Sequence, residues 1–220
     1  MNRHFSAPPA AWTPLAVPAR HPAPDPIRVR AQYLPPRHYF PLHAHDWHQL
    51  VYAVTGVLTV SVAAKRYVIS PEQAAWVPAG TLHGTGTLLG AEFHSLYVAA
   101  DPALELAAGE MVFAVPPLLR ALIVEAATLD TAAAEDAYRE QVQALILTHL
   151  RRARPMAAAL PWPVSGSLAR LCEALHAQPD DPLPLPEWSR RLGMSERTLA
   201  RRFREETGMT LRAWRRRLRL

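Results

Sequence analysis

The spacing of hydrophobic positions changes about halfway along the chain. Between residues 27 and 100 apolar and polar positions alternate, most clearly in LVYAVTGVLTVSVAAKRYVIS, residues 50–70, where turns are expected at Gly56 and at Ala63–Ala64. A period of two is typical of strands with one buried face. EFHSLYVAA, residues 92–100, predicts a further strand. Several short strands separated by turns predict a sandwich or small barrel.

The following stretch has a helical period. PPLLRALIVEAATL, residues 116–129, places apolar residues three and four apart behind two prolines, which suit a helix N-terminus. AAEDAYREQVQALILTHLRRAR, residues 133–154, begins with acidic residues and ends with arginines, as the helix dipole favours. Two helices joined by a short loop predict an antiparallel hairpin. Its remaining apolar stripe indicates a dimer contact.

Two proline-rich stretches divide the chain. Seven prolines between residues 1 and 26 predict a loosely docked arm, and PMAAALPWPVSG predicts a linker. We therefore expect an α+β protein. Its parts are an arm (1–26), a β-barrel (27–112), a helical hairpin that dimerises (113–154), a linker (155–166) and an all-α segment (167–220).

Composition limits the cellular setting. Half of the 220 residues are hydrophobic, which is ample for a buried core. The longest apolar runs are too short for a membrane span, and the first twenty residues lack the apolar core of a signal peptide. The single cysteine, Cys172, excludes an internal disulfide framework. We expect a cytoplasmic protein that does not associate with membranes.

Charge is distributed unevenly between the two parts of the chain. Residues 1–150 hold 9 basic and 12 acidic side chains, a net charge of −3. Residues 151–220 hold 15 basic and 7 acidic side chains, a net charge of +8. A basic segment behind a nearly neutral body predicts a polyanionic partner.

The basic segment contains a pattern for two helices joined by a tight turn, LPEWSRRLGMSERTLARRFREETGMT, residues 185–210. A first helix over Pro186–Leu192 runs into Gly193, which suits the left-handed conformation of a helix end. Ser195 is placed to cap the second helix. That helix buries Leu199 and Phe203 and exposes arginines. The pattern is typical of a helix-turn-helix, although an ordinary solvated basic hairpin shares its composition.

The spacing L-G-M-S-x-R-T-L-x-R-x-F-x-x-x-x-G closely resembles the first helix-turn-helix of the AraC/XylS family of transcription regulators. The resemblance implies that this segment binds double-stranded DNA. By that analogy Arg197 and Arg201 project toward base edges, whose donor and acceptor pattern guanidinium groups recognise. The cap Ser195 also belongs to the expected contact surface. The side chains expected near phosphates, which set register, are Thr198, Arg202 and Arg204.

Members of that family carry two helix-turn-helix units joined by a long helix. Here MTLRAWRRRLRL, residues 209–220, resembles the start of the joining helix, and the sequence predicts that the second unit is missing. A single unit makes fewer phosphate contacts, so weaker DNA binding is expected. A homodimer would partly compensate by joining two half-sites.

HAHDWHQL, residues 43–50, concentrates possible metal ligands. In an extended strand His43, His45 and Gln49 share one face, whereas His48 points the other way. PAGTLH places His83 after a turn, where a neighbouring strand would bring it beside the pair. Three converging imidazoles suit a divalent metal such as Zn, Fe, Ni or Cu.

The same residues resemble the two cupin motifs over about residues 35–100. His43, His45, Gln49 and Gly56 match the first motif, and Pro78, Gly80 and His83 match the second. Metal-binding cupins carry Glu where this chain has Gln49, and a neutral amide is a weaker ligand. Two alternatives therefore stay open: an effector or metal site, or pocket and core histidines hydrogen-bonded to neighbours. The aromatic candidates for the pocket wall are Trp47, Tyr52 and Trp76.

The two resemblances together imply one architecture, because cupin-like sensor domains precede the DNA-binding helices of AraC-type regulators. They imply a transcription regulator, not an enzyme, whose barrel senses a small molecule or metal and whose hairpin forms a homodimer. The alternative is a metal-dependent cupin enzyme, a dioxygenase or isomerase, with a basic helical tail. A third alternative is a dimerising fragment without useful DNA affinity. No cofactor beyond the candidate metal is expected.

Overall fold

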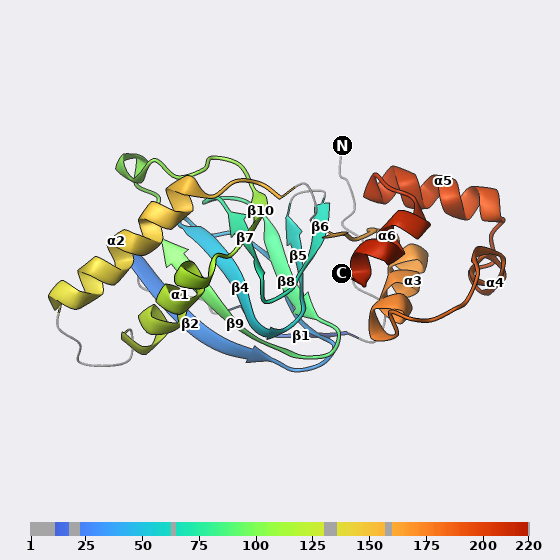
Figure 1. Ribbon diagram of the computed structural model, residues 1–220, viewed down its shortest axis with the longest axis horizontal. Helices are drawn as coiled ribbons and strands as arrows, with labels where there is room; N and C mark the ends of the chain where they lie inside the picture. The colour runs from blue at the N-terminus through green and yellow to red at the C-terminus, as the bar shows by residue number, and fades with distance from the viewer. Residues whose placement is uncertain (1–11, 18–22, 63–64, 130–135, 157–159, 220) are drawn as a thin grey trace.

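The computed structural model describes residues 12–17, 23–62, 65–129, 136–156 and 160–219. Two β-sheets pack face to face, and helices α3 to α6 lie together at one end of the molecule (Figure 1). In the described residues, sheet A has the strand order β1 (Thr13–Pro14), β3 (His38–His43), β8 (His83–Thr87), β5 (Leu58–Val62), β6 (Lys65–Ile69), β11 (Leu160–Pro161). Sheet B has the order β10 (Met111–Ala114), β7 (Gln73–Val77), β4 (His48–Gly56), β9 (Ala91–Val98), β2 (Ile27–Leu34).

The alternation along β4 explains how sheet B is buried on both sides. Val51 and Ala53 face sheet A and belong to the core between the sheets. Leu50 and Tyr52 face the opposite way and pack against helices. A strand covered on both faces has a nearly continuous apolar sequence, as in QLVYAV.

Helices α1 (Pro117–Leu129) and α2 (Asp136–Arg152) cover the outer face of sheet B (Figure 1). Leu119, Ile123 and Ile146 are fully buried in this layer. The pair confirms the predicted hairpin and places it on the sandwich. A short 3-10 helix, η1 (Pro102–Leu104), lies on the path from β9 to β10.

Helices α3 (Gly166–Ala177), α4 (Leu185–Arg191), α5 (Glu196–Thr207) and α6 (Leu211–Leu218) surround a separate core that includes Phe203 and Trp214. This core continues into the sandwich through Trp162 and Val68 of β6. The Trp214 Nε1–H donates to the Pro161 carbonyl at 2.7 Å. The Trp162 N–H donates to the carbonyl of Arg66 at 2.7 Å. The helical segment is therefore joined to the edge of sheet A by packing and hydrogen bonds.

The turn between α4 and α5 has the predicted chemistry. Gly193 adopts φ +65°, which a glycine accepts without steric cost. The Ser195 Oγ accepts from the Thr198 N–H at 3.2 Å and caps α5. Gly208 follows α5 at φ +73° and ends it. The helices and their boundaries follow from local signals in the sequence.

The α+β fold class is confirmed, and three strands were not predicted. β1 lies within the stretch 1–26, which was expected to be a loosely docked arm, and pairs with β3. β10 pairs with β7, and β11 forms within the proline-rich stretch 155–166 and pairs with β6. Proline lacks an N–H but still accepts hydrogen bonds, so it is tolerated at a sheet edge. The Ala63–Ala64 turn and most of the arm, residues 1–11 and 18–22, lie outside the described residues.

Candidate functional site

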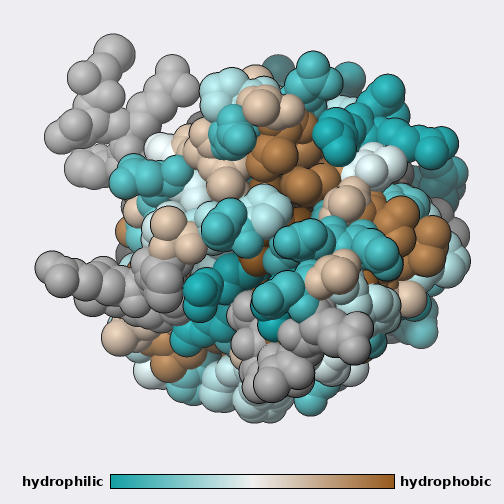
Figure 2. Space-filling view, turned by 90° about the vertical axis from the view of Figure 1, so that its left-hand side faces the viewer, coloured by the Kyte–Doolittle hydropathy of each residue, from teal (hydrophilic) through white to brown (hydrophobic). Residues whose placement is uncertain are grey.

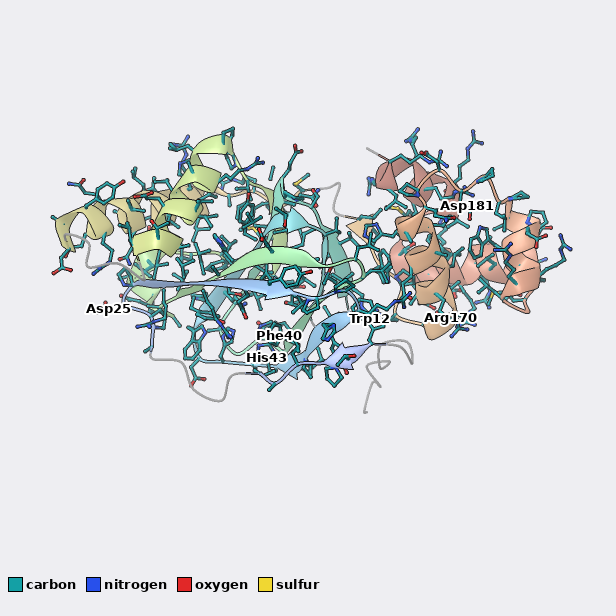
Figure 3. All side chains as sticks on the ribbon, turned by 90° about the horizontal axis from the view of Figure 1, so that it is seen from below. Trp12, Asp25, Phe40, His43, Arg170 and Asp181 are labelled. Atoms are coloured by element: carbon teal, nitrogen blue, oxygen red, sulfur yellow. The ribbon has the colours of Figure 1, made fainter. Side chains whose placement is uncertain are left out.

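Three of the predicted ligands come together where β3 ends and β8 begins, opposite Gln49 of β4 in the other sheet. His43 is opposite His83 in the pairing of β3 with β8. One ring nitrogen from each of His43, His45 and His83 lies within 4.8 Å of the others. Figure 3 shows His43 farther than Trp12 from the end of the molecule that holds α3 to α6. The structure thus brings together the three histidines that the sequence singled out.

The reason for the convergence differs from the prediction. β3 ends at His43 and β4 begins at His48, so His43, His45 and Gln49 are not on one extended strand. The intervening residues form a bend that brings His45 back toward Gln49. The expected alternation placed His43, His45 and Gln49 on one side of a strand, but the bend between β3 and β4 determines where His45 lies.

Each of the three imidazoles is held by a main-chain carbonyl. The Nδ1 atoms of His43, His45 and His83 lie 2.9, 2.7 and 2.8 Å from the carbonyl oxygens of residues 41, 47 and 81. A carbonyl only accepts, so each Nδ1 carries a proton, and such a ring in its neutral form presents its Nε2 lone pair. Metal-binding histidines in proteins are oriented in this way.

Gln49 completes the cluster. Its Oε1 lies 2.9 Å from the Nε2 of His45 and 2.8 Å from the Nε2 of His83. Its Nε2 lies 2.9 Å from the Oγ of Ser95. With the amide oxygen toward the rings, three acceptor atoms face one another, an arrangement that a cation stabilises.

A half-turn of the same amide produces a different state. Amide oxygen and nitrogen occupy equivalent positions after a 180° rotation. The NH₂ group then donates to both histidines while the oxygen accepts from the Ser95 hydroxyl, and every donor has an acceptor. The orientation of Gln49 therefore separates a cation-binding cluster from a hydrogen-bonded network without metal. The donor set fits a divalent metal in the first orientation.

Two imidazoles of the cluster, those of His43 and His83, favour the uncharged form. Burial lowers the pKa of His83 to about 4, and the neighbouring His43 and His45 add to the effect against the opposing carbonyl of Thr81. Burial also lowers the pKa of His43. Neutral imidazole is the form that binds a metal. At neutral pH these two rings are ready to act as ligands without first losing a proton.

The other predicted pocket residues lie in two different places. The Trp47 indole stacks on His45, with ring centroids 5.0 Å apart. Tyr52 and Trp76 instead belong to the core between sheet B and the helices, so they do not line the histidine cluster. His48 points the same way as predicted and stacks on Trp76 at 5.0 Å. The even-numbered residues of β4, which include Tyr52, face the helices and therefore point away from the cluster.

Two residues of the site were not predicted. Ser95 holds the Gln49 amide, and Tyr97 packs edge-on against His45 with ring centroids 5.9 Å apart. Both lie on β9, where Gln49 is opposite Tyr97. The odd-numbered residues of EFHSLYVAA, which include Ser95 and Tyr97, lie on the side of β9 that faces the cluster. The alternation alone does not show which side of the strand faces the cluster; the pairing of β4 with β9 does.

The predicted DNA-contacting residues lie along α5. Arg197, Arg201 and Arg204 are exposed, three or four positions apart, and share one side of the helix. Arg201 forms an ion pair with Glu205 at 2.8 Å, and Arg202 forms one with Glu206 at 3.8 Å. No ion pair involves Arg197 or Arg204 among the residues the structure describes. Among the described residues, two arginines of α5 thus form ion pairs, Arg201 and Arg202, and two do not, Arg197 and Arg204.

These features define a cupin-like sandwich with a histidine cluster, followed by basic helices. The AraC-like ligand binding domain family matches residues 26–185, so the chain belongs to that family. The HTH-type transcriptional regulator NimR of Escherichia coli (strain K12) is 27% identical over 180 residues, which are 82% of this chain and 66% of that protein. The chain thus spans slightly less than two thirds of this relative.

Two solved structures are similar in part. Apo ToxT from Vibrio cholerae is 8% identical, with a TM-score of 0.47, over 90% of this chain and 82% of that chain. The DMSP lyase DddQ from Ruegeria pomeroyi is 19% identical, with a TM-score of 0.33, over 34% of this chain and 40% of that chain. Within the described residues no helix is both long and apolar enough to cross a membrane.

Proposed function

We propose that the chain is a sequence-specific DNA-binding transcription regulator that acts in the cytoplasm. The observation that carries this proposal is the arginine-rich exposed side of α5. Ser195 caps this helix, and Gly193 in the turn before it has a left-handed conformation. Leu199 and Phe203 anchor its other side in the helical core. A helix presented in this way fits the major groove of B-DNA. The similarity to a protein named as an HTH-type transcriptional regulator supports the same function.

Within this proposal the exposed residues of α5 divide the work. Arg197 and Arg201 contact base edges, and Thr198, Arg202 and Arg204 contact phosphates. Ser195 keeps the N-terminus of the helix in place through its cap.

Salt-dependent duplex binding tests the DNA-binding function. Duplexes selected from a random library, and scrambled versions of them, are titrated by fluorescence anisotropy at several salt concentrations. We expect tighter binding to selected duplexes and an affinity that falls steeply with salt. Replacing Arg197, Arg201 and Arg204 together by Ala should abolish the preference, while Arg152→Ala on α2 removes an exposed charge elsewhere as a control. Equal affinity for selected and scrambled duplexes contradicts the proposal.

The sandwich is proposed to sense an effector at the histidine cluster. His43, His45 and His83, with the Gln49 oxygen, would hold a divalent metal, which would supply a site for a coordinating small molecule. In the described part of the chain this cluster contains imidazoles and the Gln49 amide without a carboxylate, so it offers no carboxylate as a general base. We therefore favour sensing over a metal-dependent dioxygenase or isomerase reaction.

The helical hairpin is proposed to form a homodimer. Leu118 and Val124 of α1, and Tyr138 and Leu145 of α2, are large apolar residues with about half their surface exposed. Figure 2 looks onto this end of the molecule and shows hydrophobic residues between hydrophilic ones. Sedimentation of the wild type against a Leu145→Glu variant measures the association. A wild type that sediments as a monomer at high concentration contradicts the dimer.

A further inference from the structure

A second cavity lies outside the sandwich, where its outer surface meets the helical segment. It has a volume of about 380 Å³ and is bounded by Trp12 beside β1, Tyr39 of β3, Trp162 after β11 and Glu173 of α3. None of the three clustered histidines lines it. Figure 3 places Trp12 on the side of the sandwich that faces Arg170 of α3. Its volume is within the range of small-molecule sites.

Small residues on the outward face of sheet A create the hollow. Gly84 and Gly86 of β8, and Thr59 and Ser61 of β5, line its floor. A Cβ at Gly86 would lie 2.9 Å from the Trp12 ring and 3.0 Å from the Cβ of Tyr39. Only a glycine lets the two aromatic rings approach this strand. The floor is therefore flat, and the walls are aromatic.

The cavity contains hydrogen-bond donors that the protein does not use fully. Arg66 donates from Nε to the Ser61 Oγ at 3.0 Å. Among the described residues no carboxylate forms an ion pair with this guanidinium, whose Nη groups remain for another acceptor. The Trp12 indole lies near Glu173, but its Nε1–H is buried without an acceptor in hydrogen-bonding geometry. Buried donors of this kind are rare unless a ligand or water satisfies them.

More positive than negative groups lie near the cavity. Arg66 and Glu173 line it, and the charges of Arg37 and Arg170 also act on the Glu173 carboxyl. His176 also lines the cavity, and burial lowers its pKa, so its ring is neutral at pH 7. The local field therefore favours an anion.

We propose that this cavity is a second effector site, distinct from the histidine cluster, that binds a small organic anion with an aromatic body. The carboxylate of the ligand would accept hydrogen bonds from Arg66 and the Trp12 indole, and its ring would lie between Tyr39 and Trp162. The occupant would touch sheet A and α3 at once, which connects the sandwich to the DNA-binding helices. This inference goes beyond the function proposed above and does not depend on metal or DNA binding.

Calorimetric titration of the full chain with three matched probes tests the chemical class. Indole-3-acetate is an anion, indole-3-acetamide is neutral and tryptamine is a cation, and all three share the same ring system. We expect the anion to bind at least tenfold more tightly than the amide, because charge-assisted hydrogen bonds are the stronger kind. Equal binding of all three, tightest binding of tryptamine, or no binding of the anion overturns the proposal.

Three variants locate the site. Arg66→Gln should weaken binding of indole-3-acetate roughly tenfold or more, whereas Glu173→Gln should leave it unchanged or strengthen it, because an acid is removed. The double variant His43→Ala/His83→Ala should bind the probe as the wild type does. If Arg66→Gln does not fold, the Glu173→Gln and histidine variants still decide. Weaker anion binding in either of them contradicts the site.

Discussion

Glu205 accepts two hydrogen bonds from the Nη1 group of Arg201, at 2.8 and 3.0 Å, one turn farther along α5. The two side chains are 56% and 61% exposed, so this contact is a surface ion pair. Such pairs contribute little to stability, about 0–1 kcal/mol. The pair holds the side chain of Arg201 along the helix, so in the proposed function DNA would compete with Glu205 for this guanidinium.

Glu205→Gln should therefore strengthen DNA binding. The substitution removes the competing carboxylate and one negative charge from the DNA-facing side. We expect an affinity gain of severalfold at low salt, worth about 1 kcal/mol, that shrinks as salt screens the charges. Anisotropy titrations at several salt concentrations measure it. Glu140→Gln, an exposed acid on α2, is the charge-matched control and should change nothing.

Arg201→Ala and Arg204→Ala should differ in kind. Loss of the proposed base contact at Arg201 should lower affinity for selected duplexes by about 1–3 kcal/mol and leave scrambled duplexes less affected. Loss of a phosphate contact at Arg204 weakens both classes equally and reduces the salt slope by about one. Binding series on both duplex classes distinguish them. Parallel losses for the two variants would show that the assignment is wrong.

Gln49→Glu should convert the cluster into a stronger metal site. A carboxylate adds a negative charge facing the lone pairs of His45 and His83, and it is a better ligand than an amide. We expect Zn²⁺ affinity to rise by about tenfold or more, since altered ligands commonly change affinity by that order. His43→Ala/His83→Ala should abolish binding. His48→Ala, whose ring faces Trp76, should retain it. Calorimetry with Zn²⁺ and elemental analysis provide the measurements.

Glu173→Gln should stabilise the protein at neutral pH. Burial raises the pKa of Glu173 despite the nearby guanidinium groups, so the folded state binds its proton more tightly than the unfolded state. The contribution of this carboxyl to stability is full below the unfolded pKa and is lost as pH rises through the raised folded value. The gain of the variant should therefore be largest near pH 7 and vanish below pH 4.5. Thermal unfolding across this window measures it, with Glu140→Gln as the control.

Gly56→Ala and Gly80→Ala separate backbone strain from steric clash. Both glycines have φ +72°, so alanine costs about 1–2 kcal/mol at either position. A Cβ at Gly56 would also lie 2.3 Å from the carbonyl oxygen of Gly90, whereas nothing lies within 4 Å at Gly80. We expect Gly56→Ala to lower the free energy of unfolding by at least about 1 kcal/mol more. Urea titration tests this, and equal losses would rule out the clash.

The local signals in the sequence predicted the helices well. Gly193 and Ser195 set the boundary between α4 and α5, and period and charge located α1 and α2. These features depend on neighbours in the chain, so composition and spacing suffice. The same holds for the α+β class, which follows from the change of period.

Features that depend on distant pairing were not predictable. The position of Tyr52 on the helix-facing side, and of Ser95 behind Gln49, follows from which face of sheet B each strand presents. The cavity beside Trp12 joins residues that are about 160 positions apart, Trp12 and Glu173. Nothing in the local pattern of either segment indicates that they meet.

The short strand β11 limits how the two parts of the molecule can move. Leu160 and Pro161 pair with β6 and form the last strand of sheet A. If the helical segment swung away together with β11, the backbone donors and acceptors of β6 would be uncovered, and open edges of this kind pair with other chains. A regulatory motion that avoids aggregation would therefore leave β11 paired with β6. The helical segment would rotate about the residues that follow β11. The strand β11 thus keeps the edge of β6 from pairing with other chains.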